Sequence, residues 1–367
     1  MKRKVRVGVI FGGKSAEHEV SLQSAKNVIE AIDKEKYEVV PIAIGKEGKW
    51  HIGVSYDALV ASDNSKLAKL NPSDVTLALV PGQEQRFVAL SSPVEVGPLD
   101  VVFPVLHGPY GEDGTIQGFL KLADIPFVGA GVAGSAVGMD KELAKRLLRE
   151  ASIPIARFLV VPLSMRSKVS FSNVAARLGT PVFVKPANLG SSVGVSKVKS
   201  KEEFGPAVAH AFEFDRKILI EEFIQGREIE CAVLGNDTPI ASLPGEVIPR
   251  HEFYSYDAKY LDENGAALEI PVKLPEETVR RVQELAVKAF KALSCEGMGR
   301  VDFFLKENGE LLVNEINTIP GFTKISMYPK LWEASGIPYT ELIDRLIQLA
   351  LERFEEEKKL KTSFTQS

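Results

Sequence analysis

The chain has 367 residues, of which 45% are hydrophobic and 26% are charged, and its formal net charge at pH 7 is −4. This length is typical of two or three domains, and the near-neutral charge gives no general reason to expect nucleic acid or an anionic membrane as a partner. With only two cysteines, Cys231 and Cys295, the sequence indicates neither a disulfide framework nor a cysteine-based zinc site, and we expect a cytoplasmic protein. The apolar run at residues 5–11 contains Arg6 and is too short for a signal peptide, and no run of about 18 apolar residues occurs, so we expect a soluble chain.

The first expected element is a strand at residues 5–11, followed by a Gly-Gly-Lys-Ser turn and a helix that begins near Glu17. Residues 8–15 also fit the phosphate-binding pattern G-x-x-x-x-G-K-[ST]. We reject a P-loop because Gly8 lies inside the apolar run, which leaves too few residues to wrap a phosphate. No convincing strand ends in the aspartate that would hold Mg²⁺ in such enzymes.

Further strands are expected at residues 37–44 and 99–107. Strands separated by helical lengths indicate a parallel α/β layer. The second strand ends in His107, and a glycine-rich loop with Glu112 and Asp113 follows, at the end of a strand where open α/β sheets bind ligands. These acids could belong to a site, or they could simply complement the dipole of the next helix.

Residues 129–134 match G-x-G-x-x-G, the dinucleotide-binding pattern. The context does not fit, because Pro126 interrupts the preceding strand and the next suitable acid, Glu150, lies in a helical pattern. We therefore expect no dinucleotide site here. Lys141 opens the helix at 143–150 and, on sequence alone, is typical of a surface lysine.

Residues 181–198 predict a strand, a loop and a second strand. Lys185 stands before the loop, and Ser191 and Ser192 lie in it, so the unit could bind the phosphates of ATP through hydroxyls, backbone N–H groups and a fixed positive charge. A long hairpin turn without a ligand is the alternative. Residues 217–224 predict another strand, which ends in acids. These acids would suit adenine and ribose contacts, but acids are also common at the ends of strands that bind no ligand.

Residues 253–260 are aromatic and turn-like, which is typical of a lid. Helices are expected at residues 275–292 and 339–357, and the charged tail at 358–367 is expected to fray.

Residues 299–322 predict a β-hairpin whose apolar runs flank Asn308-Gly309. This dipeptide favours a two-residue type I′ turn, which fixes the register of the two strands. The pairing would place Asp302 opposite Glu315 and Arg300 opposite Asn317. Phe304 and Val313 would lie on the same face.

Two carboxylates that face each other across strands repel unless a positive group lies between them. Asp302, Glu315 and Asn317 would offer hard oxygen ligands, which Mg²⁺ takes together with substrate phosphates. An exposed acidic face of an ordinary hairpin is the alternative. Apolar residues on both faces argue against it.

Seven motifs together are similar to those of the D-alanine:D-alanine ligases of the ATP-grasp superfamily. They lie in the family's order over nearly the whole chain, with weak resemblance at residues 46–96 and 162–172. The motifs are Gly-Gly-Lys-Ser-Ala-Glu-His-Glu-Val-Ser at 12–21, Leu-His-Gly-Pro-Tyr-Gly-Glu-Asp-Gly-Thr at 106–115, Met-Asp-Lys at 139–141, the segment 184–194, Tyr-Asp-Ala-Lys-Tyr at 256–260, Gly-Arg-Val-Asp at 299–302 and Asn-Glu-Ile-Asn-Thr-Ile-Pro-Gly at 314–321.

The resemblance implies a mixed α/β, three-domain ATP-grasp architecture in which two sheets clamp ATP. The expected domains are an N-terminal substrate domain at 1–128, a central ATP-grasp subdomain at 129–220 and a C-terminal ATP-grasp domain at 221–357, followed by the tail. It also implies ATP as a substrate, two Mg²⁺ ions with Mn²⁺ as an alternative, no nucleic acid or membrane partner, and a homodimer.

The resemblance further implies residue roles. The catalytic group would be Glu17, Ser191, Tyr260, Arg300 and the backbone N–H of Gly321. ATP would contact Lys141, Lys185, Ser192, Glu221, Glu222, Ile224, Glu228 and Phe304. The amino-acid substrates would contact His107, Lys259 and Ser326. Asp302, Glu315 and Asn317 would hold the metal ions.

The implied reaction is ATP-dependent ligation of two D-alanine molecules through D-alanyl phosphate, for peptidoglycan precursors. Tyr260 is a modest indication of dipeptide formation, since relatives that use D-lactate have phenylalanine there. An ATP-grasp enzyme with another acid or amine and a nucleotide-binding regulatory module remain as alternatives.

Overall fold

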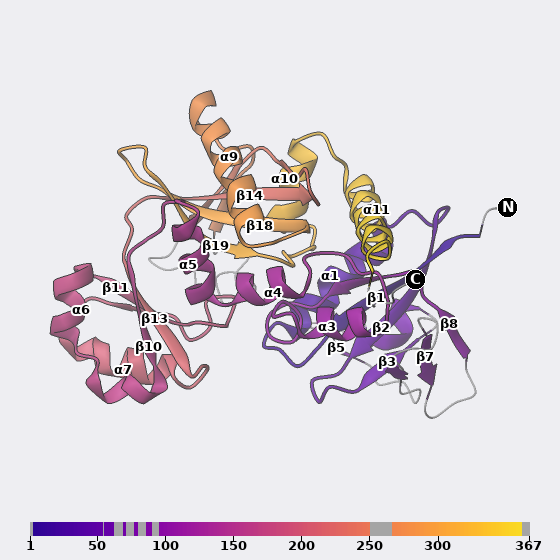
Figure 1. Ribbon diagram of the computed structural model, residues 1–367, viewed down its shortest axis with the longest axis horizontal. Coiled ribbons are helices and arrows are strands. Elements are labelled where there is room, and N and C mark those ends of the chain that lie inside the picture. Colours follow the sequence, from indigo (N-terminus) through magenta and orange to yellow (C-terminus); the bar gives the residue numbers. More distant parts are fainter. Residues whose placement is uncertain are drawn as a thin grey trace.

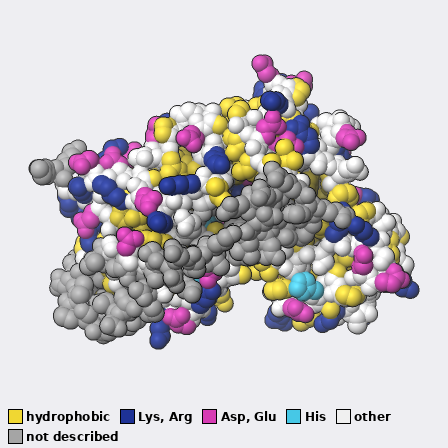
Figure 2. Space-filling view, turned by 180° about the vertical axis from the view of Figure 1, so that it is seen from behind, with side chains coloured by type: hydrophobic (Ala, Val, Ile, Leu, Met, Phe, Trp, Pro, Cys, Tyr) yellow, Lys and Arg dark blue, Asp and Glu magenta, His cyan; other side chains and the backbone are white. Residues whose placement is uncertain are grey.

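The structure is a computed structural model that describes residues 3–53, 55–61, 69–70, 77–79, 86–89, 95–249 and 266–361. Its architecture is mixed α/β, with three main sheets (Figure 1). No helix in these ranges is long and apolar enough to cross a membrane. On the face drawn in Figure 2, basic and acidic side chains of the described residues are intermingled, as the small net charge suggests.

The N-terminal sheet has the strand order β3-β2-β1-β9. Strands β2, β1 and β9 are parallel, which confirms the expected α/β layer, and β3 adds an antiparallel edge. Gly8 pairs with Val40 and Val102 inside β1, so it cannot begin a phosphate loop. The elements are β1 (Val5–Gly12), α1 (His18–Ala31), β2 (Tyr37–Ile44), β3 (Trp50–Ile52), β9 (Val101–Val105) and α3 (Thr115–Leu122).

Side chains of β1 alternate between two cores, as a strand buried on both faces requires. Val7, Val9 and Phe11 pack with α1, whereas Ile10 packs with α3 on the opposite face. Shorter elements lie between β3 and β9 in the chain, and their five described strands form two small antiparallel sheets, β4-β5 and β6-β7-β8. They are α2 (Tyr56–Leu59), β4 (Val60–Ala61), β5 (Lys69–Leu70), β6 (Leu77–Leu79), β7 (Arg86–Ala89) and β8 (Glu95–Pro98).

The central sheet is antiparallel with the order β10-β13-β11-β12. The β11 and β12 pair confirms the expected strand, loop and strand at 181–198. Helices α6 and α7 cover one face, where they bury a separate core. The elements are α4 (Val132–Met139), α5 (Lys141–Glu150), β10 (Phe158–Pro162), the 3-10 helix η1 (Leu163–Lys168), α6 (Phe171–Leu178), β11 (Val182–Pro186), β12 (Ser196–Val198), α7 (Lys201–Ala211) and β13 (Lys217–Glu222).

The C-terminal sheet has the order β17-β16-β14-β18-β19, with β15 paired to β14. Helix α9 covers one face of this sheet. Helices α10 and α11 pack on the other face and share a hydrophobic core with the N-terminal sheet (Figure 1). The elements are β14 (Arg227–Gly235), β15 (Ile240–Ala241), β16 (Gly245–Pro249), β17 (Ala266–Glu269), α9 (Glu276–Ala292), β18 (Gly297–Leu305), β19 (Leu311–Asn317), α10 (Met327–Ala334) and α11 (Tyr339–Glu357).

The β18–β19 hairpin has a different turn from the one predicted. Lys306 N–H donates to Glu310 O at 3.0 Å and Gly309 N–H donates to Lys306 O at 2.9 Å, so the loop holds three residues, 307–309, rather than two. Of these three, only Gly309 has a positive φ, 81°. The type I′ prediction is wrong because Asn308-Gly309 also suits a type I turn followed by a left-handed glycine.

The longer loop shifts the pairing by one residue, so Phe304 lies opposite Leu312 instead of Val313. Val313 therefore does not share the face of Phe304, as was predicted, but packs in the core beneath α9. An irregularity between Asp302 and Phe303 then restores the register. Asp302 faces Glu315 and Arg300 faces Asn317, as predicted.

Candidate active site

The turn after β1 brings Glu17 to the loop between β11 and β12. Glu17 is 7% exposed, and Ser191 Oγ donates a hydrogen bond to its carboxylate. A Cβ atom at Gly190 would lie 3.3 Å from Glu17 Oε2, so glycine permits this close approach. Two residues of the expected catalytic group are therefore in contact.

His107 lies buried at the end of β9 between two other segments. Its Nδ1 is 3.1 Å from Ile319 O and its Nε2 is 3.0 Å from Ser24 Oγ. A carbonyl oxygen can only accept, so Nδ1 carries the proton and Nε2 accepts from Ser24. Burial lowers the pKa of His107. The ring is thus neutral and fixed in one tautomer beside Ile319.

Glu112 joins the site, whereas its neighbour Asp113 does not. Glu112 Oε2 accepts from Gly108 N–H at 2.7 Å, and Oε1 accepts from Ile319 N–H at 3.2 Å. Burial raises the pKa of Glu112 to about 8, and the charge of Glu17 adds to this effect. Asp113 instead accepts from Thr115 N–H at the start of α3, as expected of an acid that complements a helix N-terminus.

A second group of charges surrounds Glu221 on β13. Lys185 Nζ lies 2.6 Å from its Oε2, and Lys145 Nζ lies 3.2 Å from its Oε1. Burial alone would raise the pKa of Glu221, but the two lysines outweigh it and hold this pKa below its ordinary value. Lys185 is therefore bound to an acid here rather than to the loop beside it.

Lys141 connects this group to the hairpin. Its Nζ donates to Leu189 O at 2.6 Å and lies 3.9 Å from Glu315 Oε2. Burial lowers the pKa of Lys141. The surface-lysine interpretation is wrong, because only 11% of this side chain is exposed.

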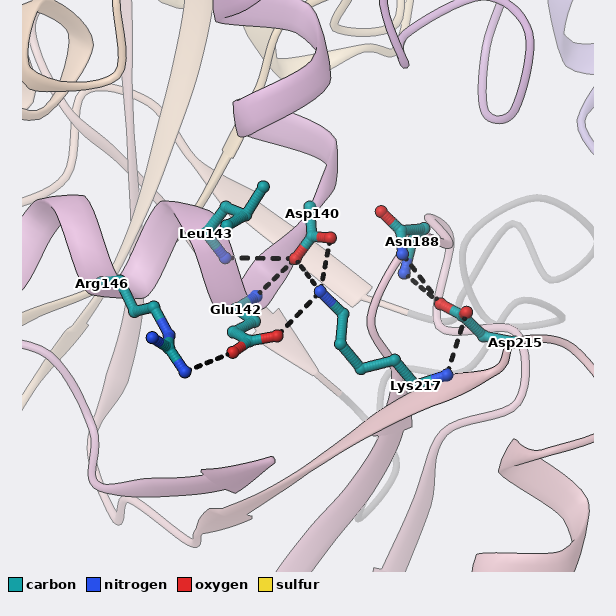
Figure 3. A network of polar contacts seen from close by, with 7 residues as sticks. All are labelled: Asp140, Glu142, Leu143, Arg146, Asn188, Asp215 and Lys217. Atoms are coloured by element: carbon teal, nitrogen blue, oxygen red, sulfur yellow. Dashed lines mark hydrogen bonds and ion pairs between the residues drawn. The ribbon is translucent and has the colours of Figure 1, made fainter. Parts of the chain in front are cut away.

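The N-terminus of α5 is held against β13 by the polar network shown in Figure 3. Asp140 caps α5 by accepting from the N–H groups of Glu142 and Leu143. Lys217 Nζ donates to Asp140 Oδ2 at 2.6 Å and pairs with Glu142 at 2.8 Å. Asp215 accepts from Asn188 N–H at 2.8 Å, next to the Gly-Ser loop. These contacts hold both Lys141 and the loop against one strand.

The hairpin face brings together Arg300, Asp302 and Asn317. Arg300 Nε and Nη2 each donate to Asp302 at 2.8 Å, and Asn317 Nδ2 donates to Asp302 Oδ2 at 3.0 Å. Glu230 on β14 lies 2.7 Å from Arg300 Nε. Burial lowers the pKa of Arg300, but Asp302 and Glu230 outweigh it and raise the pKa above its ordinary value.

The donors at this face suit a magnesium ion bound together with phosphate. Asp302 and Glu315 are opposite one another and Asn317 is adjacent, which gives two carboxylates and an amide oxygen. No cluster of three or more His, Cys, Asp or Glu side chains that could hold a metal occurs in the described part of the chain. The amide and the ligand's own oxygens would therefore have to complete any ion's coordination.

The structure brings two of the other expected ATP residues together and turns the side chain of a third away. Ile224 packs with Phe304 and Leu312 in a small apolar cluster. The Glu222 carboxylate is turned to Arg157, whose Nε donates to it at 2.7 Å, so this side chain does not join the Glu221 group. Glu228, on β14, is opposite Phe304.

Ser326 precedes α10, where its Oγ accepts from Thr323 N–H at 3.0 Å. A Cβ atom at Gly321 would lie 2.8 Å from Ser326 Oγ, so these two expected site residues are adjacent. Lys259, Tyr260 and Ser192 complete the expected set. Ser192 has a positive φ of 59° in the Gly-Ser loop, whereas Lys259, Tyr260 and the expected lid at 253–260 lie outside the described residues.

The sequence matches two family models, described as D-ala D-ala ligase N-terminus over residues 6–130 and D-ala D-ala ligase C-terminus over residues 147–348. A D-alanine–D-alanine ligase of Shouchella clausii is 56% identical over 361 residues, which is 98% of each chain. The D-alanine–D-alanine ligase A of Escherichia coli is 52% identical and covers 98% of this chain and 99% of its own. The chain belongs to the D-alanine–D-alanine ligase family.

Solved structures of the D-alanine–D-alanine ligase family share the fold. The ligase from Coxiella burnetii matches with a TM-score of 0.84 at 40% identity, covering 97% of this chain and 96% of its own. The VanG D-Ala:D-Ser ligase from Enterococcus faecalis matches with a TM-score of 0.83 at 35% identity, covering 95% and 100%. The fold is therefore the ATP-grasp fold of these ligases, as the sequence resemblance implied.

Within this ligase fold, four charged residues were given no role by the sequence. Glu112 was left open between two interpretations, whereas Lys145, Lys217 and Glu230 were not considered. Lys145 lies four positions after Lys141, so one helical turn could have suggested a second inward lysine. Lys217 reaches Asp140 and Glu142 at the start of α5, and Glu230 reaches Arg300 across paired strands. Both contacts join segments distant in sequence, for which the local pattern holds no signal.

Proposed function

We propose that this protein joins two D-alanine molecules into D-alanyl-D-alanine through a D-alanyl phosphate intermediate, with release of ADP and phosphate. The dipeptide would serve peptidoglycan precursor synthesis in the cytoplasm. Membership of the D-alanine–D-alanine ligase family over both family models supports the reaction most directly. The convergence of Glu17, Ser191, Lys141 and the hairpin acids supports the location of the site.

The first substrate would bind between the N-terminal sheet and the hairpin. The Glu17 carboxylate, paired with Ser191, would receive the ammonium group of the first D-alanine, with Tyr260 completing the group. Neutral His107 lies near the same place and would contact this substrate. Lys259 and Ser326 would hold the carboxylate of the second D-alanine.

Phosphoryl transfer comes first, because a carboxylate does not react with an amine unless it is activated. Lys141, Lys185 and the Ser192 loop would hold the phosphates of ATP, and the apolar cluster of Ile224 and Phe304 would contact adenine, near Glu221, Glu222 and Glu228. We assign Asp302, Glu315 and Asn317 to two Mg²⁺ ions, with Mn²⁺ as an alternative. Such ions, when bound, neutralise charge on the transferring phosphoryl group.

Peptide bond formation follows when the amine of the second D-alanine attacks the acyl phosphate. Arg300 and the backbone N–H of Gly321 would donate to the developing oxyanion, where one preorganised donor contributes roughly 3 kcal/mol. The lid expected at 253–260 would exclude water, which otherwise hydrolyses the acyl phosphate.

The decisive assay measures phosphate release together with chromatographic detection of D-alanyl-D-alanine. Phosphate release should require both Mg²⁺ and D-alanine, and release that is unaffected by D-alanine would exclude the proposal. Unchanged phosphate release after removal of the Asp302 and Glu315 carboxylates would instead favour a nucleotide-binding regulatory module.

The second substrate is a separate question, because one structural neighbour is a D-Ala:D-Ser ligase. We propose D-alanine on the basis of Tyr260. A panel of D-alanine, D-serine, D-lactate and L-amino acids, compared by kcat/KM, tests this assignment. We also propose a homodimer, which light scattering coupled to size-exclusion chromatography would detect.

A further inference from the structure

Three neighbouring strands place one acid each in a single row across the C-terminal sheet. Glu230 on β14 is opposite Asp302 on β18, and Asp302 is opposite Glu315 on β19. Residues directly opposite in adjacent strands share a face. The side chains of Glu230 and Asp302 are 12% and 15% exposed, so both are largely withdrawn from solvent.

Arg300 lies between the first two acids of this row. Arg300 Nε and Nη2 each donate a hydrogen bond to Asp302 at 2.8 Å, and Nε also lies 2.7 Å from Glu230 Oε2. Ala232, a small residue, is opposite Arg300 on β14. The guanidinium is thus shared between one acid assigned to the metal ions and one acid with no role so far.

This arrangement creates a conflict in the proposed reaction, which Glu230 can resolve. Asp302 Oδ2 already accepts from both Arg300 Nη2 and Asn317 Nδ2, so a metal ion bound through this oxygen would displace a donor and weaken the hold of Asp302 on Arg300. If Asp302 were the only partner of Arg300, metal binding would leave a mobile guanidinium where a fixed donor is required. A donor contributes to an oxyanion site only when it is held in place beforehand.

We propose that Glu230 is a positioning residue that holds Arg300 at the reaction centre when Asp302 turns to the metal ions. This inference rests on the proposed ligase function. It goes beyond that function because it gives Glu230 the role of holding Arg300 rather than a metal ion. Glu230 also keeps Arg300 from binding Asp302 alone, so it makes Asp302 more available.

The test compares Glu230→Gln with Glu246→Gln. Glu246 belongs to another arginine–glutamate pair on the same sheet, in which Arg227 Nε lies 2.8 Å from Glu246 Oε1. The two glutamate side chains are similarly buried, 12% and 10% exposed. Thermal unfolding of both variants measures how much stability each loses with its arginine–glutamate ion pair. A kinetic difference between two variants of similar stability then reports the positioning of Arg300.

The first readout separates kcat from KM. We expect Glu230→Gln to lower kcat for dipeptide formation by about 10²-fold, the effect of a misplacement of about 1 Å, with KM for D-alanine nearly unchanged. Glu246→Gln should keep the wild-type kcat. Equal kcat values for the two variants would overturn the proposal.

The second readout is a double-mutant cycle with Arg300→Met. If Glu230 acts through Arg300, Glu230→Gln should lower kcat no further in that background. A reduction of the same size in both backgrounds would contradict the proposed route.

The third readout needs no turnover. Titration calorimetry with Mn²⁺ and ADP, without D-alanine, should show that Glu230→Gln binds at least about fivefold more weakly than the wild type. In the variant Arg300 competes for Asp302, and the positive charge of Arg300 is less compensated. Unchanged affinity would count against the shared-arginine arrangement. Dipeptide formation by the wild type tests the ligase function alone, so failure of that function and failure of the positioning role are distinguishable.

Discussion

Ser191 Oγ donates a hydrogen bond to the Glu17 carboxylate, although 174 positions separate the two residues in the chain. The contact joins the turn after β1 to the loop between β11 and β12. Ser191 itself has a positive φ of 51°, a conformation that non-glycine residues rarely adopt. The proposed ammonium-binding acid and the proposed phosphate-binding loop are therefore in direct contact.

Replacing this serine should separate the two parts of the site. Ser191→Ala leaves Glu17 without this donor, and we expect kcat/KM for D-alanine to fall by at least about tenfold, since an optimally placed catalytic group is disturbed. Ser164→Ala, in exposed η1, is the control and should match the wild type. Wild-type kinetics for Ser191→Ala would show that the contact has no part in catalysis.

The hairpin acids provide a second prediction. Asp302→Asn and Glu315→Gln should each reduce D-alanine-dependent phosphate release by at least about 10²-fold, as expected when charge stabilisation at a metal site is removed. Glu310→Gln is the matched control, because Glu310 lies at the turn of the same hairpin, where its exposed carboxylate pairs with Lys306 at 2.9 Å. A loss of similar size in that control would point to hairpin folding rather than to chemistry.

The α5 cap can be divided into its two contributions. Asp140→Asn keeps a good N-cap but removes the charge that faces Lys217, whereas Asp140→Ala removes both. Loss of an N-cap costs about 1 kcal/mol, so Asp140→Ala should be less stable to denaturant than Asp140→Asn by about that amount. Both variants should raise KM for ATP, because Lys141 and the Gly-Ser loop are held by the same network. An unchanged KM in both would mean that the network serves stability alone.

His107 gives a prediction about pH. Burial lowers its pKa below 6.5 in the folded state, so below that pH the unfolded chain binds more protons and the free energy of unfolding falls as the solution is acidified. His107→Asn keeps a donor for Ile319 O but cannot titrate. The loss of stability between pH 7.5 and pH 5, measured by urea unfolding, should therefore be smaller in the variant than in the wild type. A variant that loses stability as steeply as the wild type would assign the acid sensitivity to another group.

The sequence predicted the elements that have strong local patterns. Residues 37–44 and 339–357 form a strand and a helix with those bounds, because a short apolar run and amphipathic spacing are local patterns. The pairing of Asp302 with Glu315 was also predicted correctly, although the reason was wrong. The turn is one residue longer than expected, and the strand irregularity offsets it.

The sequence could not predict which charges neutralise one another. Glu221 and Lys185 lie on neighbouring strands, and their ion pair depends on antiparallel pairing of β13 with β11. Glu230 meets Arg300 only because β14 pairs with β18. Such contacts follow from tertiary register, so residue type and spacing along the chain do not indicate them.

The turn and the strand irregularity are the two places where this hairpin can change length without moving the acid row. Residues 303–305 pair one to one with residues 311–313, whereas the 307–309 loop and the extra residue of β19 have no partner in the ladder. A deletion among the paired residues would shift the register and invert the face of the residues between the change and the acids. We therefore expect homologues to gain or lose residues of this hairpin in the loop or at the irregularity, and within the paired segments only in matching pairs.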